Sequence, residues 1–120
     1  MARLGTVSAS GAPRLVPFVF ALDGDRLVSA VDHKPKATTR LRRLDDIAAN
    51  PAVSVLVDAY DDDWSQLWWA RADGRASVHP AYDLAALVAK YPQYAGRPPA
   101  GPVIVVEVTR WSGWSAGRAE

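Results

Sequence analysis

Short β-branched runs separated by turn residues fill the first third of the chain, and this pattern constrains its fold more than any other feature. The runs occupy residues 4–8, 15–22 and 27–31. The segments between them, Ser10-Gly11-Ala12-Pro13 and Asp23-Gly24-Asp25, are typical of hairpin turns. The pattern therefore predicts a three-stranded antiparallel meander. Pro17 has no N–H to donate, which places its strand at a sheet edge or at a bulge.

Two short helices are expected farther along the chain. The first covers residues 41–48, where apolar residues recur at helical spacing behind Thr38 or Thr39 and the run stops at Asn50-Pro51. The second covers residues 84–91, where apolar residues keep the i, i+3, i+4, i+7 spacing and the run ends before Pro92.

The remaining apolar segments predict further strands. Residues 53–60 form one strand, residues 66–78 form a long strand or a hairpin interrupted at Ala72-Asp73-Gly74, and residues 103–108 and 111–115 form closing strands. Together with the first three, they make about six or seven strands and two helices, which fits a small antiparallel barrel. The expected fold class is mainly β (α+β).

Length and composition limit the cellular setting and the partners. A chain of 120 residues corresponds to one domain, here residues 1–120. The sequence has no cysteine, a formal net charge of +1, and no apolar stretch longer than the eight residues 15–22. A membrane helix needs about 18 apolar residues or more, so no membrane partner is expected and a cytoplasmic location is the simplest assignment. The near-neutral charge argues against nucleic acid as a partner.

No metal site is expected. His33 and His79 lie far apart in the sequence, and there are no thiolates to accompany them. The run Asp61-Asp62-Asp63 offers carboxylates, but such a run is more commonly a solvated loop. The sequence also lacks a GxGxxG motif and a P-loop, which argues against those two nucleotide-binding folds.

A basic cluster at the junction between a strand and the first helix is the strongest candidate site. Five cations fall within ten positions: Lys34, Lys36, Arg40, Arg42 and Arg43. Guanidinium groups match phosphate oxygens, and a helix N-terminus near Thr38 adds free N–H groups, so the junction suits an anion. On the residues alone, a solvated basic face balanced by Asp45 and Asp46 is the more common meaning of such a cluster.

The tryptophans indicate a partner subunit and a possible ring contact. Trp68 and Trp69 are adjacent on one expected strand, so they point to opposite faces, and a small domain can cover only one of them. We therefore expect a homodimer. Trp111 and Trp114 are three residues apart and also face opposite sides unless Gly113 forms a bulge, which leaves one of them available to a ligand.

Several long segments resemble a known family. They are residues 14–24 (RLVPFVFALDG), 32–36 (DHKPK), 38–44 (TTRLRRL) and Asn50-Pro51, and they look like the pyridoxamine 5′-phosphate oxidase-like split β-barrel superfamily. Residues 61–64 (DDDW), 71–76 (RADGRA), 90–94 (KYPQY) and 109–114 (TRWSGW) make the chain similar to an actinobacterial branch of F420-dependent oxidoreductases. Members usually carry a helix before the first strand, and here the first expected strand almost abuts Met1.

This resemblance implies an FMN-binding type of split β-barrel. It also implies a homodimer whose cofactor, coenzyme F420 or alternatively FMN, lies in a groove between subunits. The cofactor phosphate would be held by Lys36, Arg40, Arg42 and Arg43 of the basic cluster, and Lys34 is a further candidate for cofactor binding. The strand carrying Val16, Pro17 and Phe18 would line the ring, and Trp111 is a further candidate for ring contact.

The leading functional hypothesis is an oxidoreductase that transfers a hydride between F420 and a small unsaturated or conjugated substrate. Such a cofactor carries the chemistry, so the absence of an identifiable catalytic acid or base does not count against an enzyme. The alternatives are an FMN-dependent oxidoreductase of the same fold, a flavin- or deazaflavin-binding protein without turnover, and, least favoured, a nucleic-acid-binding barrel.

Overall fold

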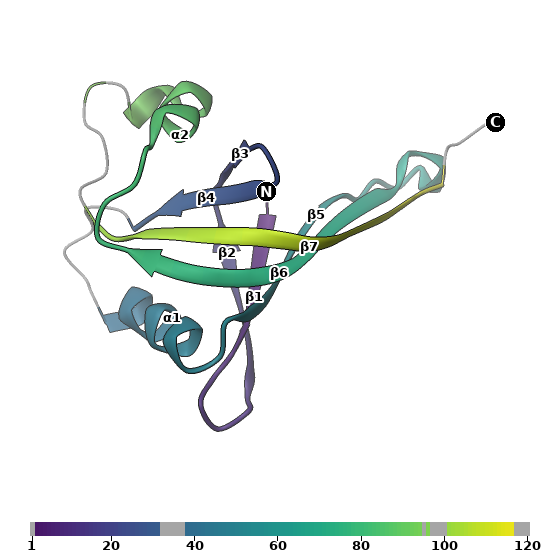
Figure 1. Ribbon diagram of the computed structural model, residues 1–120. Coiled ribbons are helices and arrows are strands. Elements are labelled where there is room, and N and C mark those ends of the chain that lie inside the picture. The colour runs from purple at the N-terminus through teal and green to yellow at the C-terminus, as the bar shows by residue number, and fades with distance from the viewer. Residues whose placement is uncertain (1, 32–37, 95, 97–100, 117–120) are drawn as a thin grey trace.

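The computed structural model describes residues 2–31, 38–94, 96 and 101–116. In this part of the chain, seven strands form one antiparallel sheet in the order β2-β1-β5-β6-β7-β4-β3 (Figure 1). The strands are β1 (Ala2–Val7), β2 (Pro13–Phe18), β3 (Ala21–Asp23), β4 (Arg26–Ala30), β5 (Ala52–Ala59), β6 (Trp68–His79) and β7 (Val103–Ser115). The helices are α1 (Thr38–Ala49) and α2 (Ala85–Lys90), with 3₁₀ turns at Trp64–Gln66 and Pro92–Tyr94.

Two hydrophobic clusters hold this sheet between the two helices. Inside the barrel, Leu4, Val55 and Val106 pack with Ile47 of α1. On the other side of β4 and β7, α2 buries Leu87 in the second cluster. Strand β7 serves both clusters because successive strand residues point to opposite faces, and Val103 to Val106 are all buried. The mainly β fold with two helices is as expected.

The ends of β5, β6 and β7 extend beyond the barrel as an arm (Figure 1). The arm begins at a bulge, where Asp73 pairs with Arg110 but Gly74 pairs with Val108. Thr109 is the extra residue, and its hydroxyl donates to the carbonyl of Asp73 at 3.1 Å. A side chain at position 74 would collide with the carbonyl of Glu107, so glycine is required at this close approach.

The expected first meander is wrong in one respect. Residues 15–22 are not one strand: β2 ends at Phe18, and β3 begins at Ala21 on the opposite edge of the sheet. Strand β2 pairs with β1, whereas β3 pairs with β4. The apolar pattern is continuous across the break because Phe18 and Ala21 are both buried, although in different clusters. The edge position expected for the strand of Pro17 is confirmed.

Two other expectations are corrected. Residues 103–108 and 111–115 form one strand, β7, because the bulge at Thr109 lets pairing with β6 continue. Residues 66–78 correspond to the single strand β6, so the hairpin alternative at Ala72-Asp73-Gly74 is wrong. The first helix, by contrast, stops before Asn50 as expected, and the N–H of Asn50 donates to the carbonyl of Asp46. Within the described residues, no helix is long and apolar enough to cross a membrane.

Candidate functional site

The basic cluster is described only at its C-terminal end. Lys34 and Lys36 lie outside the described residues, as does the side chain of Arg40 in the first turn of α1. Arg42 is exposed on α1, and Arg43 is half-buried. Arg43 is therefore the cation of the cluster whose surroundings define a site.

A first hollow of about 160 Å³ joins Arg43 to β2. It is lined by Pro17, Phe18, Val19, Ser29, Ala30, Arg43 and Tyr94. The structure thus brings together three of the predicted cofactor contacts, which come from α1 and from the end of the edge strand. Phe18 is buried in the barrel core and Pro17 is exposed, so the edge of β2 forms a wall of the hollow. Val16 does not line it and packs instead against the barrel core.

A second hollow, of about 400 Å³, shares Phe18 and Val19 with the first and is also lined by Lys90 and Tyr91. The ammonium of Lys90 donates to the carbonyl of Phe20 at 2.6 Å and lies 4.2 Å from the centre of the Phe20 ring. The hydroxyl of Tyr91 donates to the same carbonyl at 3.2 Å. These contacts attach the end of α2 to the connector between β2 and β3.

A third hollow, of about 220 Å³, lies where the barrel opens toward the arm. It shares Phe20 with the second hollow, and Trp68 and Trp111 are among its other lining residues. Trp111 is 53% exposed, so its ring is accessible. We call the three successive hollows the candidate groove. The groove has a guanidinium near one end and aromatic rings at the other.

Sequence reasoning did not single out Ser29, Lys90, Tyr91 and Tyr94 as site residues. Lys90, Tyr91 and Tyr94 belong to the segment KYPQY, which carries part of the family resemblance. The bond from Lys90 to Phe20 spans 70 residues, so no local pattern reveals it. A cation at the end of a helix followed by closely spaced tyrosines is the one signal that the sequence offers.

The aspartates of the run 61–63 accept local hydrogen bonds that stabilise a turn. The carboxylate of Asp61 accepts from the N–H of Asp63, and the carboxylate of Asp63 accepts from the hydroxyl and the N–H of Ser65. The hydroxyl of Ser65, and then its N–H, lower the pKa of Asp63 from the ordinary value because both stabilise the charged form. In the part of the chain that the structure describes, no three His, Asp or Glu side chains are grouped closely enough to hold a metal.

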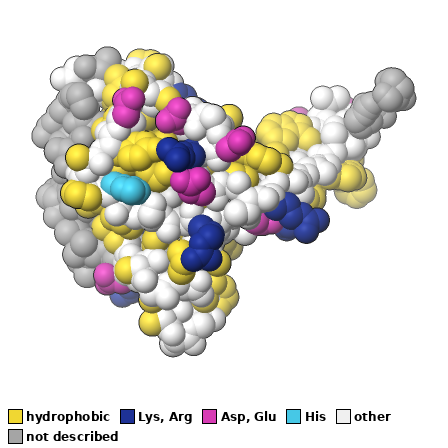
Figure 2. All heavy atoms as spheres, viewed as in Figure 1, with side chains coloured by type: hydrophobic (Ala, Val, Ile, Leu, Met, Phe, Trp, Pro, Cys, Tyr) yellow, Lys and Arg dark blue, Asp and Glu magenta, His cyan; other side chains and the backbone are white. Residues whose placement is uncertain are grey.

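The arm exposes large apolar side chains around a separate hollow of about 350 Å³. Its walls include Tyr60, Trp68, Trp69 and Trp114, with Arg71 and Asp58 as the charged members. Trp68 and Trp114 are 41% and 50% exposed. Apolar side chains are visible along the arm in Figure 2, while the face of the barrel in that view mixes acidic, basic and apolar groups. Trp111 pairs with Ala72 and Trp114 pairs with Trp69. Ala72 and Trp69 are three residues apart on β6 and so point to opposite faces, which places the two tryptophans on opposite sides, as expected.

These features coincide with a known family. The profile of the pyridoxamine 5′-phosphate oxidase family matches residues 1–115, and the chain belongs to this family. No curated protein matches the sequence at a significant level. The family has a flavin-binding fold and includes oxidoreductases.

Three similar solved structures illustrate the range of proteins with this fold. An F420 reductase is 27% identical, with a TM-score of 0.65 over 92% of this chain and 87% of that one. A heme storage protein from Vibrio cholerae is 13% identical, with a TM-score of 0.71 over 95% and 84%. An FAD-binding protein from Mesorhizobium loti is 20% identical, with a TM-score of 0.64 over 93% and 83%. The last two establish likeness of fold alone.

Proposed function

We propose that this chain is an oxidoreductase that transfers a hydride between coenzyme F420 and a small unsaturated or conjugated substrate. The observation that carries the proposal is its likeness to the F420 reductase, which is 27% identical and covers 92% of the chain. The alternative cofactor is FMN, which the family's flavin-binding fold also supports.

The residues of the candidate groove suit such a cofactor. Arg43 and the edge of β2 offer a guanidinium and a strand edge to a phosphate group. The adjoining hollows offer Phe20 and Trp111 to a flat ring. When bound, a deazaflavin supplies a ring that accepts and releases a hydride.

The residues of the chain itself bind the cofactor and orient it. Arg43 holds the anionic group, and this fixes one end of the cofactor against α1. Lys90 and Tyr91 fix the Phe20 carbonyl and so hold the residue that the second and third hollows share. Phe20 and Trp111 then determine which face of the ring is covered and which face meets substrate.

We further propose that the active form is a homodimer, because the groove and the arm need a cover to exclude water. Trp68, Trp111 and Trp114 are 41%, 53% and 50% exposed. On the barrel, Leu15 of the edge strand is 77% exposed. Apolar surfaces of this kind mark contacts with another protein, and a second copy of the chain would bury them by an isologous contact.

Equilibrium binding of F420 and FMN to the same purified sample tests the proposed function. We expect F420 to bind more tightly and the loaded protein to oxidise reduced F420 in the presence of a conjugated carbonyl or nitro compound. Tighter binding of FMN would favour the FMN-dependent alternative. Binding without any turnover would favour a cofactor-binding protein, and failure to bind either cofactor would overturn the proposal.

A further inference from the structure

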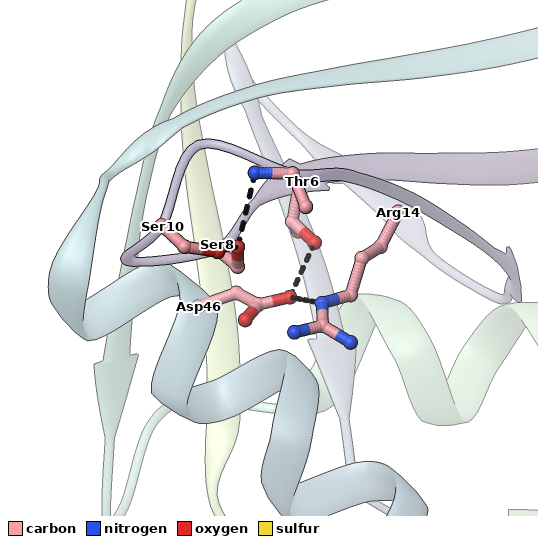
Figure 3. Close-up of polar contacts among 6 residues, drawn as sticks. Thr6, Ser8, Ser10, Arg14 and Asp46 are labelled. Carbon is pink, nitrogen blue, oxygen red and sulfur yellow. Dashed lines mark hydrogen bonds and ion pairs between the residues drawn. The ribbon is translucent and has the colours of Figure 1, made fainter.

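A buried carboxylate joins α1 to the first two strands of the sheet. The side chain of Asp46 on α1 is only 4% exposed. Its Oδ2 accepts from the hydroxyl of Thr6 on β1 at 3.1 Å and lies 3.0 Å from Nε of Arg14 on β2. Figure 3 shows the three side chains converging from their separate elements. Asp45, its neighbour in the sequence, is exposed, so only one of the two aspartates belongs to the solvated face that the sequence suggested.

The contact between Asp46 and Arg14 is an ion pair without the alignment of a hydrogen bond, whereas Thr6 makes a true hydrogen bond. A carboxylate removed from water, such as that of Asp46, needs partners of this kind. Loss of the Asp46 carboxylate would leave the charge of Arg14 without its partner. Both interactions cross between elements that are distant in sequence. They therefore fix the position of α1 relative to β1 and β2.

The same helix and the same edge strand both line the first hollow of the groove, together with β4 and the Pro92–Tyr94 turn. Arg43 precedes Asp46 by three residues, which places the two side chains on the same side of α1 in successive turns. Arg43 lines the hollow opposite Pro17 and Phe18, at the far end of the strand that carries Arg14. The ion pair thus joins α1 to the opposite end of the strand whose last residues line the hollow.

We propose that Asp46 is a positioning residue for the anion contact. By holding α1 to β2 through Arg14, and to β1 through Thr6, it sets the distance at which Arg43 meets the anionic group of the cofactor. This inference rests on the proposed function, because it assigns a role within the same groove.

The test compares Asp46→Asn with Asp45→Asn, which removes the same charge from the exposed neighbour. For each protein, the affinities for F420 and for its phosphate-free deazaflavin core are measured; FMN and riboflavin replace them if FMN binds more tightly. The ratio of the two affinities reports the anion contact alone. We expect Asp46→Asn to lower the ratio by at least about threefold, a coupling typical of residues in one network, and Asp45→Asn to leave it unchanged.

A second variant, Arg14→Met, keeps Asp46 and its bond to Thr6, and it changes a half-exposed side chain. We expect the same fall in the ratio from Arg14→Met, and no further fall in the double variant with Asp46→Asn. An unchanged ratio in Arg14→Met and in folded Asp46→Asn would overturn the inference. Equal losses of affinity for both ligands would also overturn the inference, because they would mean that Asp46 only stabilises the fold. If the wild-type protein binds none of the four ligands, the proposed function fails. This outcome differs from the two above, in which the wild-type protein binds its ligands and only the inference about Asp46 fails.

Discussion

At the scale of single residues, Arg43 is the group on which the proposed anion site depends most. It is half-buried on α1 and faces the exposed edge of β2. The sequence singled out Arg43 because it belongs to a local cluster of cations and Pro17 because it is a proline in a strand, whereas Phe18 came from the family resemblance. It did not identify Asp46 or Lys90, because their partners Thr6 and Phe20 are 40 and 70 residues away.

Replacing Arg43 by Met is expected to weaken F420 binding about tenfold to a hundredfold. A hydrogen bond to a charged group contributes about 1.5–3 kcal/mol, which corresponds to that range. Titration of the variant by deazaflavin fluorescence measures the change, and the wild-type affinity should also fall with added salt. The control is Arg26→Met, since Arg26 on β4 contacts Tyr82 and Glu107 away from the groove. A change of less than about twofold in Arg43→Met would mean that Arg43 belongs to a solvated face.

Replacing Ser65 by Ala is expected to raise the pKa of Asp63. The hydroxyl of Ser65 is the largest cause of the lowered pKa, so its removal destabilises the carboxylate. A lowered pKa in the folded state contributes stability above the ordinary pKa of an aspartate, and this contribution is lost as the pH falls through the folded value. The difference in melting temperature between Ser65→Ala and wild type should therefore shrink in acid. Side-chain NMR titration of Asp63 measures the pKa directly, and an unchanged value would contradict the assignment.

At the scale of elements, the bulge between β6 and β7 is the point where the barrel becomes the arm. Gly74 allows this because its α-carbon lies against the backbone of Glu107. The sequence identified Asp73-Gly74 as an interruption but not its nature, because a bulge and a turn use the same residues. It predicted both helices and most strand positions, whereas the split of residues 15–22 was missed because both halves are apolar.

Gly74→Ala is expected to destabilise the protein by about 1–3 kcal/mol, the usual cost of forcing an added group into packed structure. The obstacle is backbone, so it cannot move aside as a flexible side chain would. Urea unfolding followed by tryptophan fluorescence measures the loss. Gly96→Ala is the matched control, because a methyl group there meets nothing within 4 Å. Equal stability of the two variants would show that the bulge tolerates a side chain.

At the scale of the whole molecule, the arm carries the surface on which the proposed dimer depends. Trp68, Trp111 and Trp114 of the arm are exposed, and two of them, Trp68 and Trp111, line the third hollow of the groove. A covering subunit would therefore contribute to the cofactor site as well as to stability.

Sedimentation at micromolar concentration is expected to give a dimer, and Trp114→Glu is expected to give a folded monomer. The added charge would be placed in an apolar contact, where an unpaired carboxylate is costly. Ala89→Glu adds the same charge on the exposed side of α2 and should leave the dimer intact. A stable wild-type monomer would contradict the proposed assembly, and a dimeric Trp114→Glu would place the interface elsewhere.

The short connection between β2 and β3 limits how far the two margins of the sheet can separate. These two strands are the opposite margins of the sheet, yet only Val19 and Phe20 separate them in the chain. Three residue steps span at most about 10 Å. This connection therefore keeps the adjoining ends of β2 and β3 close together, even though the two strands do not pair with each other along the seam between them. The first two hollows lie along that seam, and Val19 lines both. The length of this two-residue connection therefore limits the width of both hollows. Each residue inserted between Phe18 and Ala21 would allow the gap between the two strands to widen by up to about 3.5 Å.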